Sequence, residues 1–240
     1  MVVWMLVLAG SVATPSVAAV ALYRGGLATG LPPRRSAAVA VTVGAVWGAW
    51  VGTSAALAAN DVYHDPDAVV PWLGVAALAA LIAALLAARI PALGRILAAS
   101  GATPRPAWPH AVRVLGVLFL IAMVQGTLPA VFALPAGLGD MAIGVAAIVL
   151  ARRWNRRRAV WFNVFGLLDL VVAVTLGLLG GLATHPILPV SPSTAAMSLL
   201  PLALIPTTVV PLDAALHVLS LARLRRATRS AAVPVPAVGS

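Results

Sequence analysis

Seven long apolar segments, separated by short polar ones, dominate this sequence. They cover residues 3–23, 36–59, 68–88, 112–129, 136–151, 159–182 and 194–221. A helix rises about 1.5 Å per residue and the hydrocarbon core of a membrane is about 30 Å thick, so segments of roughly 16 to 28 residues are long enough to cross it. The sequence therefore predicts an all-α integral membrane protein, a seven-transmembrane-helix bundle.

The composition indicates the same class of protein. Of the 240 residues, 62% are hydrophobic and 9% are charged, and the mean hydropathy is +1.03. One soluble core of this size cannot bury so much apolar surface, so lipid must cover part of it. The chain has no Cys, which excludes disulfides and thiolate metal sites.

The charges between the segments give an orientation. All 16 basic residues are Arg. If the N-terminus lies outside, every Arg falls in a cytoplasmic connection or in the C-terminal tail, whereas an outer loop holds Asp61, Asp65 and Asp67. We predict this orientation, with a cytoplasmic C-terminus, in a bacterial cytoplasmic (inner) membrane. The arginines then have a sufficient cause in topology and in contact with the lipid bilayer, so we expect no nucleic-acid partner.

The pattern predicts a single transmembrane domain, residues 1–222, followed by a tail. Residues 223–240 start with several arginines and continue as Pro- and Ala-rich sequence, which is typical of a disordered cytoplasmic tail. Between the third and fourth segments, apolar side chains from Ile90 to Leu97 predict a short interfacial helix. In the seventh segment, Pro201, Pro206 and Pro211 predict kinks.

Three of the six acidic residues, Asp140, Asp169 and Asp213, lie inside apolar segments. Counting about 1.5 Å per residue from the cytoplasmic ends places them roughly 16, 15 and 12 Å deep. Asn163 and His217 lie roughly 6 Å deep, and His217 is one helical turn from Asp213. An intramembrane carboxylate costs several kcal/mol unless it is protonated, paired or ligated. We therefore predict a carboxylate layer near the midplane, with an Asn/His layer below it.

This polar ladder is the candidate site. We expect no arginine at its depth, because each Arg lies at or beyond the end of a segment. Three unpaired carboxylates cannot all ionise in a low dielectric, so protons or a bound cation must neutralise them. The leading hypothesis is a small cation- or proton-linked transporter or channel-like protein. In it, Asp140, Asp169 and Asp213 form the site, Asn163 and His217 form an inner relay, and no cofactor is needed beyond a bound cation.

A short motif supports a second hypothesis. Gly137-Leu138-Gly139-Asp140 resembles the G-x-G-D motif of intramembrane aspartyl proteases. The resemblance implies a membrane-embedded hydrolase in which Asp140 and a second Asp, here Asp169, activate water. The chain departs from that family in two respects, one of which is that Pro201-Leu202-Ala203-Leu204 stands where the family has a downstream Pro-Ala-Leu. Its proteases carry the partner Asp upstream of the motif, usually as Tyr-Asp, where this chain offers Gln125.

Each polar residue also has a purely structural interpretation. Asp140 follows Pro135 by about one and a half turns and would interact with a helix N-terminus. Asn163 and Gln125 would form hydrogen bonds between helices, and His217 would cap a helix end. These interpretations define a third hypothesis, a non-catalytic membrane subunit or scaffold. The sequence identifies neither a substrate nor an oligomeric state.

Overall fold

The computed structural model describes residues 1–65, 70–99, 105–182 and 187–231. Every element in these parts is a helix, which confirms the predicted all-helical class. In chain order they are α1 (Val2–Ala28), α2 (Pro33–Ala59), α3 (Trp72–Ala87), α4 (Pro91–Ala99), the 3₁₀ helix η2 (Arg105–Gly116), α5 (Val117–Val124), α6 (Ala130–Arg152), α7 (Arg156–Gly177), the π-helical turn η3 (Leu178–Leu182), the 3₁₀ helix η4 (Thr194–Ser198), the π-helical turn η5 (Ile205–Val209) and α8 (Val210–Ala231).

Six helices in the described parts of the chain are long and apolar enough to cross a membrane. They are α1, α2, Ala107–Val124, α6, Arg156–Gly181 and Ile205–Arg226. Helix α3 is equally apolar but has only 16 residues, and α4 follows it after a bend of 85°. Counting this bent pair as one span raises the number to seven. Helix α4 corresponds to the short helix predicted from Ile90 to Leu97.

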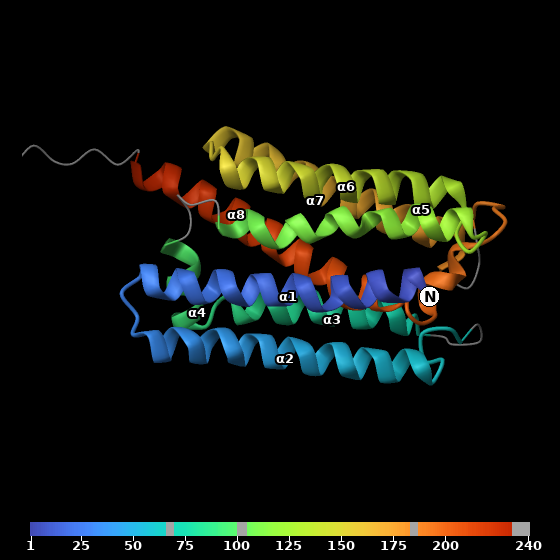
Figure 1. Ribbon diagram of the computed structural model, residues 1–240, viewed down its shortest axis with the longest axis horizontal. Helices are drawn as coiled ribbons and strands as arrows, with labels where there is room; N and C mark the ends of the chain where they lie inside the picture. The colour runs from blue at the N-terminus through green and yellow to red at the C-terminus, as the bar shows by residue number, and fades with distance from the viewer. Residues whose placement is uncertain (66–69, 100–104, 183–186, 232–240) are drawn as a thin grey trace, which may run out of the picture.

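The helices form two groups joined by α8. Figure 1 shows α1, α2 and α3 in one group and α5, α6 and α7 in the other, with α8 crossing obliquely between them. Helix α8 packs against α3 on one side and α7 on the other. Helix η2 packs against both α1 and α6. The interior of the bundle is therefore built where α8 and η2 meet the two groups.

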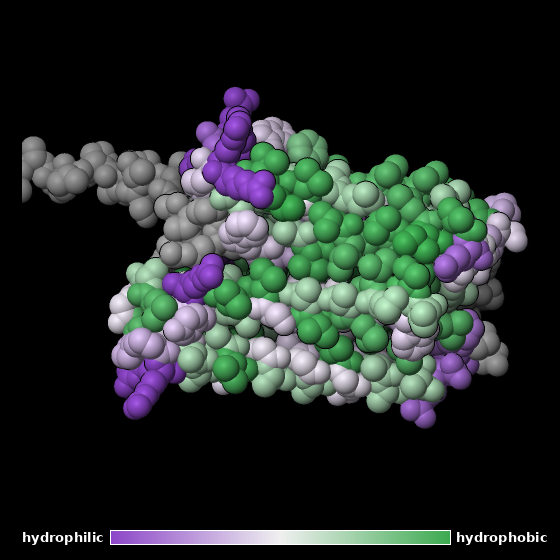
Figure 2. Space-filling view, in the orientation of Figure 1, coloured by the Kyte–Doolittle hydropathy of each residue, from purple (hydrophilic) through white to green (hydrophobic). Residues whose placement is uncertain are grey.

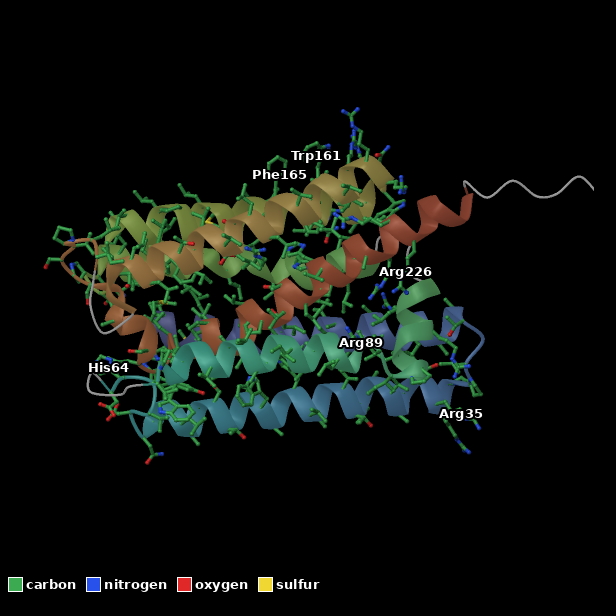
Figure 3. All side chains as sticks on the ribbon, turned by 180° about the vertical axis from the view of Figure 1, so that it is seen from behind. Arg35, His64, Arg89, Trp161, Phe165 and Arg226 are labelled. Atoms are coloured by element: carbon green, nitrogen blue, oxygen red, sulfur yellow. The ribbon has the colours of Figure 1, made fainter. Side chains whose placement is uncertain are left out.

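Charged side chains gather at the ends of the bundle. With the exception of Arg113, the arginines lie in segments at one end, where α1, α3, α6 and α8 finish and α2 and α7 begin. Figure 3 shows Arg35, Arg89 and Arg226 at this end and His64 at the opposite one. Figure 2 shows an apolar surface between hydrophilic ends. Charge and apolar surface are thus separated along the helix axes.

Helix α1 continues to Ala28 through Gly25 and Gly26, beyond the end of the predicted segment at residue 23. The two glycines lie where α1 meets its neighbours. A Cβ on Gly26 would lie 2.6 Å from Ser36 Oγ, and a Cβ on Gly25 would lie 2.8 Å from Ile96 Cγ2. The glycines therefore allow close packing against α2 and α4, and this packing supports a helix that local propensity disfavours.

The connection between the fourth and fifth apolar segments lies earlier in the chain than predicted. Helix α5 ends at Val124, so Gln125 is exposed at its C-terminus and not deep in a span. Helix α6 begins at Ala130, which places Pro135 inside a helix where an outer turn was predicted. Asp140 is consequently near the middle of a 23-residue helix. Its interpretation as a residue at a helix N-terminus is wrong, because that interaction falls off within the first turn.

The seventh predicted segment, 194–221, is broken. Helix η4 is separated by a turn from η5 and α8, which form the continuous span Ile205–Arg226. Of the three prolines predicted to cause kinks, Pro201 lies in the break, Pro206 lies in the π-helical turn and Pro211 lies in the first turn of α8. Helix α8 extends to Ala231, so residues 223–231 are helical although a disordered tail was predicted. Residues 232–240, and Asp67 of the predicted outer loop, lie outside the described residues.

Candidate functional site

Two of the predicted aspartates bind one arginine. Arg113 Nε and Nη2 lie 2.7 and 2.6 Å from Asp140 Oδ1, and Nη2 also contacts Asp169 Oδ2. Only 4% of Arg113 is exposed. The expectation that no arginine shares this depth is wrong. The span starts at Ala107, and the 3₁₀ helix η2 rises about 2 Å per residue, so Arg113 lies well inside it.

The third aspartate, Asp213, lies against a histidine. His110 Nδ1 is 3.1 Å from Asp213 Oδ1, and the two side chains are 1% and 2% exposed. Their relative orientation is not that of a hydrogen bond, and neither atom has another hydrogen-bond partner among the described residues. A buried carboxylate oxygen in this state is unusual, because nearly all buried polar atoms are paired.

His217 connects the arginine to the lower polar layer. Its Nε2 lies 3.3 Å from Arg113 Nη1, and its Nδ1 lies 2.9 Å from Asn163 Oδ1. A guanidinium can only donate, so Nε2 accepts and Nδ1 donates to the amide oxygen. Asn163 Nδ2 in turn donates to Ser220 Oγ at 3.1 Å and to the Ala159 carbonyl at 2.6 Å. The two contacts therefore select one neutral tautomer of His217.

The two histidines stack and join these contacts into a single group. The His110 and His217 ring centroids are 3.8 Å apart with an interplanar angle of 15°. Phe162 borders both rings, with centroids at 5.5 and 5.3 Å. We call this group the charged cluster; it consists of His110, Arg113, Asp140, Asn163, Asp169, Asp213 and His217. All five residues predicted from the sequence belong to it.

Glycines bring the helices of the cluster close together. A Cβ on Gly116 would collide with Asp140, one on Gly139 with the Asp169 carboxylate, and one on Gly166 with the His217 ring. Gly139, from the G-x-G-D sequence, therefore makes room for Asp169. Asp140 and Asp169 both bond to Arg113, whereas the carboxylates of an aspartyl dyad share one proton. This arrangement does not favour the hydrolase hypothesis.

Residues 70–225 match the sequence family of the domain of unknown function DUF8737. The chain belongs to the DUF8737 family. The DUF8737 region begins before α3, ends within α8 and contains every residue of the charged cluster. Helices α1 and α2 precede it. No curated protein and no solved structure matches the chain.

Helix α1 closes a small cavity against the DUF8737 region. The cavity measures about 40 Å³. Arg113, Asp140 and Asp213 line it from the cluster side, and Val7 and Thr14 line it from α1. A water molecule needs about 10–15 Å³ measured in this way, so the cavity has room for two or three small ligands. The cluster is therefore not fully packed, and it is largely buried, with the Asp140 and Asp169 side chains 21% and 14% exposed.

Sequence reasoning missed His110, Arg113 and Thr14. His110 lies in the connection before the fourth predicted segment, and Arg113 lies at the very start of that segment, 112–129. Their i, i+3 spacing was the available signal, since residues three apart lie on the same side of a 3₁₀ helix. Thr14 had no such signal, because a threonine in an apolar segment is unremarkable.

The charges of the cluster do not balance. One guanidinium faces three carboxylates, so two negative charges are in excess when all three carboxylates are ionised and both histidines are neutral. A low-dielectric interior penalises each uncompensated charge by several kcal/mol. The cluster can relieve this penalty by taking up protons or by binding a cation, and these are the two chemistries that its residues permit.

Proposed function

We propose that the protein crosses the cytoplasmic membrane of a bacterium seven times, with its N-terminus outside and its C-terminus in the cytoplasm. Large apolar side chains cover the sides of the bundle. Val41 is 68% exposed and Leu78 is 58% exposed. Figure 3 shows Trp161 and Phe165 projecting outward from α7, where they are 51% and 53% exposed. Lipid would cover this surface, and the arginine-rich end would face the cytoplasm.

Within that membrane, the charged cluster would move protons or a small cation. The observation that supports this most strongly is the excess of carboxylates over cations in a largely buried site. A purely structural ion pair needs balanced charges, and imbalance is costly in a low dielectric. Ionisable groups inside a span are typical of proton relays and ion pathways. The site is stabilised when it takes up a proton or a cation, and transport requires that it release this charge again. Such a site suits transport better than a scaffold does.

The cluster also offers a route along the membrane normal. Asp213 contacts His110, which stacks on His217, and His217 bonds to Asn163 and through it to Ser220. On α8 these positions progress from Asp213 toward the arginine-rich end. An imidazole can accept a proton at one nitrogen and release one from the other. These groups would therefore be stations for a proton between the carboxylates and the cytoplasmic side, with water molecules completing the steps that lack a direct hydrogen bond.

Flux through lipid vesicles tests this proposal. Purified protein is reconstituted with an internal pH-sensitive dye, and a potassium diffusion potential drives proton entry. We expect Asp169→Asn and Asp213→Asn to abolish flux while the protein stays folded, as judged by gel filtration and circular dichroism. The matched control is Asp61→Asn, an exposed loop position that should keep the wild-type rate.

Three results would count against this proposal. Wild-type proton and cation flux in both variants would overturn the proposal. Tolerance of changes at all three aspartates, together with a protein that remains bound during purification, would favour the scaffold hypothesis. Reaction with a labelled transition-state mimic of aspartyl proteases would instead revive the hydrolase hypothesis for Asp140 and Asp169.

A further inference from the structure

Two buried oxygen atoms, on residues that line the small cavity, have no hydrogen-bond partner, although Asp213 Oδ1 lies 3.1 Å from His110 Nδ1. Thr14 Oγ1 and Asp213 Oδ1 form no hydrogen bond with any described residue, although each residue is only 1% exposed. Both residues line the same cavity of about 40 Å³. Since buried polar atoms are almost always paired, two such oxygens at one cavity indicate a ligand that the protein itself does not supply.

The charge of the site favours a cation as this ligand. The cluster carries more carboxylates than cations, and Asp213 faces a histidine whereas Asp140 and Asp169 both contact Arg113. Arg113 also lines the cavity, but the two carboxylates that it contacts offset its charge. A positive ligand beside Asp213 would therefore lower the electrostatic cost of the whole cluster.

The donor atoms and the volume narrow the choice of cation. Carboxylate and hydroxyl oxygens are hard ligands that suit alkali and alkaline-earth ions, whereas transition metals prefer nitrogen and sulfur. In the parts of the chain that the structure describes, no three His, Cys, Asp or Glu side chains are placed to share a metal ion. One carboxylate and one hydroxyl suit a monovalent ion, and the cavity has room for a small ion with one or two waters.

We propose that Thr14 and Asp213 bind a sodium-sized monovalent cation in this cavity. The inference deepens the proposed function, because it names the ion that would be coupled to or carried by the cluster. Binding can nevertheless be measured whether or not the protein transports anything. It also gives α1 a role: a helix outside the DUF8737 region supplies one ligand, and α8 supplies the other.

Thermal unfolding of the purified full chain in detergent tests the proposal. Unfolding is followed in NaCl, in KCl and in N-methylglucamine chloride at equal ionic strength. We expect NaCl to raise the Tm by roughly 3–6 °C over N-methylglucamine chloride at ten times the Kd, and KCl to raise it less. Thr14→Val, which replaces the hydroxyl by a methyl group, and Asp213→Asn should abolish the rise.

Ser16→Ala is the matched control. Ser16 is on the same helix, but its hydroxyl donates to the Val12 carbonyl at 2.7 Å and is not among the cavity's unpaired oxygens. This variant should keep the full sodium effect. If Asp213→Asn fails to fold, Thr14→Val alone decides, because it removes no charge. A sodium effect of equal size in Thr14→Val and wild type would overturn the proposal.

Other results separate this inference from the proposed function. A wild-type protein that shows no specific response to sodium would overturn the cation site and indicate that the cavity holds ordered water only. Proton flux without a sodium response would keep the proposed function and reject this site. A sodium response lost in Thr14→Val, in a protein that moves neither protons nor sodium, would support the site and reject transport.

Discussion

Arg113 contacts Asp140 Oδ1 through two nitrogens, Nε at 2.7 Å and Nη2 at 2.6 Å. The same guanidinium contacts Asp169. One side chain on η2 thus connects α6 and α7 at the centre of the bundle. A buried ion pair is a weak source of net stability, but loss of one partner leaves a buried charge uncompensated. The stability of the fold should therefore be most sensitive to substitutions that change the net charge of Arg113, Asp140 and Asp169.

Replacing Arg113 with Met should destabilise the protein by about 3–5 kcal/mol, because it leaves three carboxylates without a guanidinium. Thermal or denaturant unfolding in detergent measures the effect. Adding Asp140→Asn and Asp169→Asn to the same chain should recover much of the loss, since the amides carry no charge. Arg95→Met, at an exposed position on α4, is the control and should change the stability little. Equal stability of Arg113→Met and Arg95→Met would contradict the buried ion pair.

Gly139→Ala should disrupt the cluster by steric contact alone. The added Cβ would collide with the Asp169 carboxylate and move it away from Arg113. We expect a loss of about 1–3 kcal/mol in the free energy of unfolding, together with reduced flux. Gly74→Ala on α3 is the control, because no atom lies within 4 Å of its added Cβ. That change should stabilise the helix slightly, so equal responses of the two variants would count against the packing described at Gly139.

The start of the α8 span depends on a contact with α2. Trp50 Nε1 donates to the Thr207 carbonyl at 2.9 Å, within the π-helical turn η5. Trp50→Phe keeps the apolar ring but leaves that carbonyl unpaired, so we expect a loss of about 1 kcal/mol in stability and faster amide hydrogen exchange in η5. Trp47→Phe on the same helix serves as the control. Unchanged exchange in the Trp50 variant would show that the bond does not hold η5.

Tyr63 should titrate at unusually high pH. Burial raises the pKa of Tyr63 above its usual value of 10.0, and the hydrogen bond with Ser54 lowers it in part. The folded state thus holds this proton more tightly than the unfolded state. The resulting stability is present below pH 10 and is lost as the pH rises through the folded-state pKa. The difference in ultraviolet titration between wild type and Tyr63→Phe measures the pKa of Tyr63. A titration midpoint at or below pH 10 would contradict the burial of this side chain.

The membrane-like helices and five of the seven cluster residues could be predicted from the sequence. A carboxylate in an apolar segment is conspicuous because it is costly there, and counting from the segment ends placed Asp140, Asp169 and Asp213 at similar depth. The i, i+4 spacing placed His217 beside Asp213 on one helix. These inferences used only local distances along single helices, and such distances follow directly from helix geometry.

The remaining features depend on contacts between distant segments. Gly25, Gly26 and Pro135 weaken helices by local propensity, yet packing keeps all three inside helices. Arg113 was assigned to the membrane surface because its span was expected to start later and to rise as an α-helix. Thr14 could be found only once α1 was placed against the charged cluster. Propensity and periodicity contain no information on which helices become neighbours.

The most direct test of the account is whether the wild-type protein moves charge at all. Vesicles containing the purified full chain, and protein-free vesicles of the same lipid, are given the same potassium diffusion potential, and internal pH and radioactive sodium uptake are followed. We expect acidification or sodium uptake well above that of the protein-free vesicles. Rates equal to those of the protein-free vesicles for both ions would contradict it.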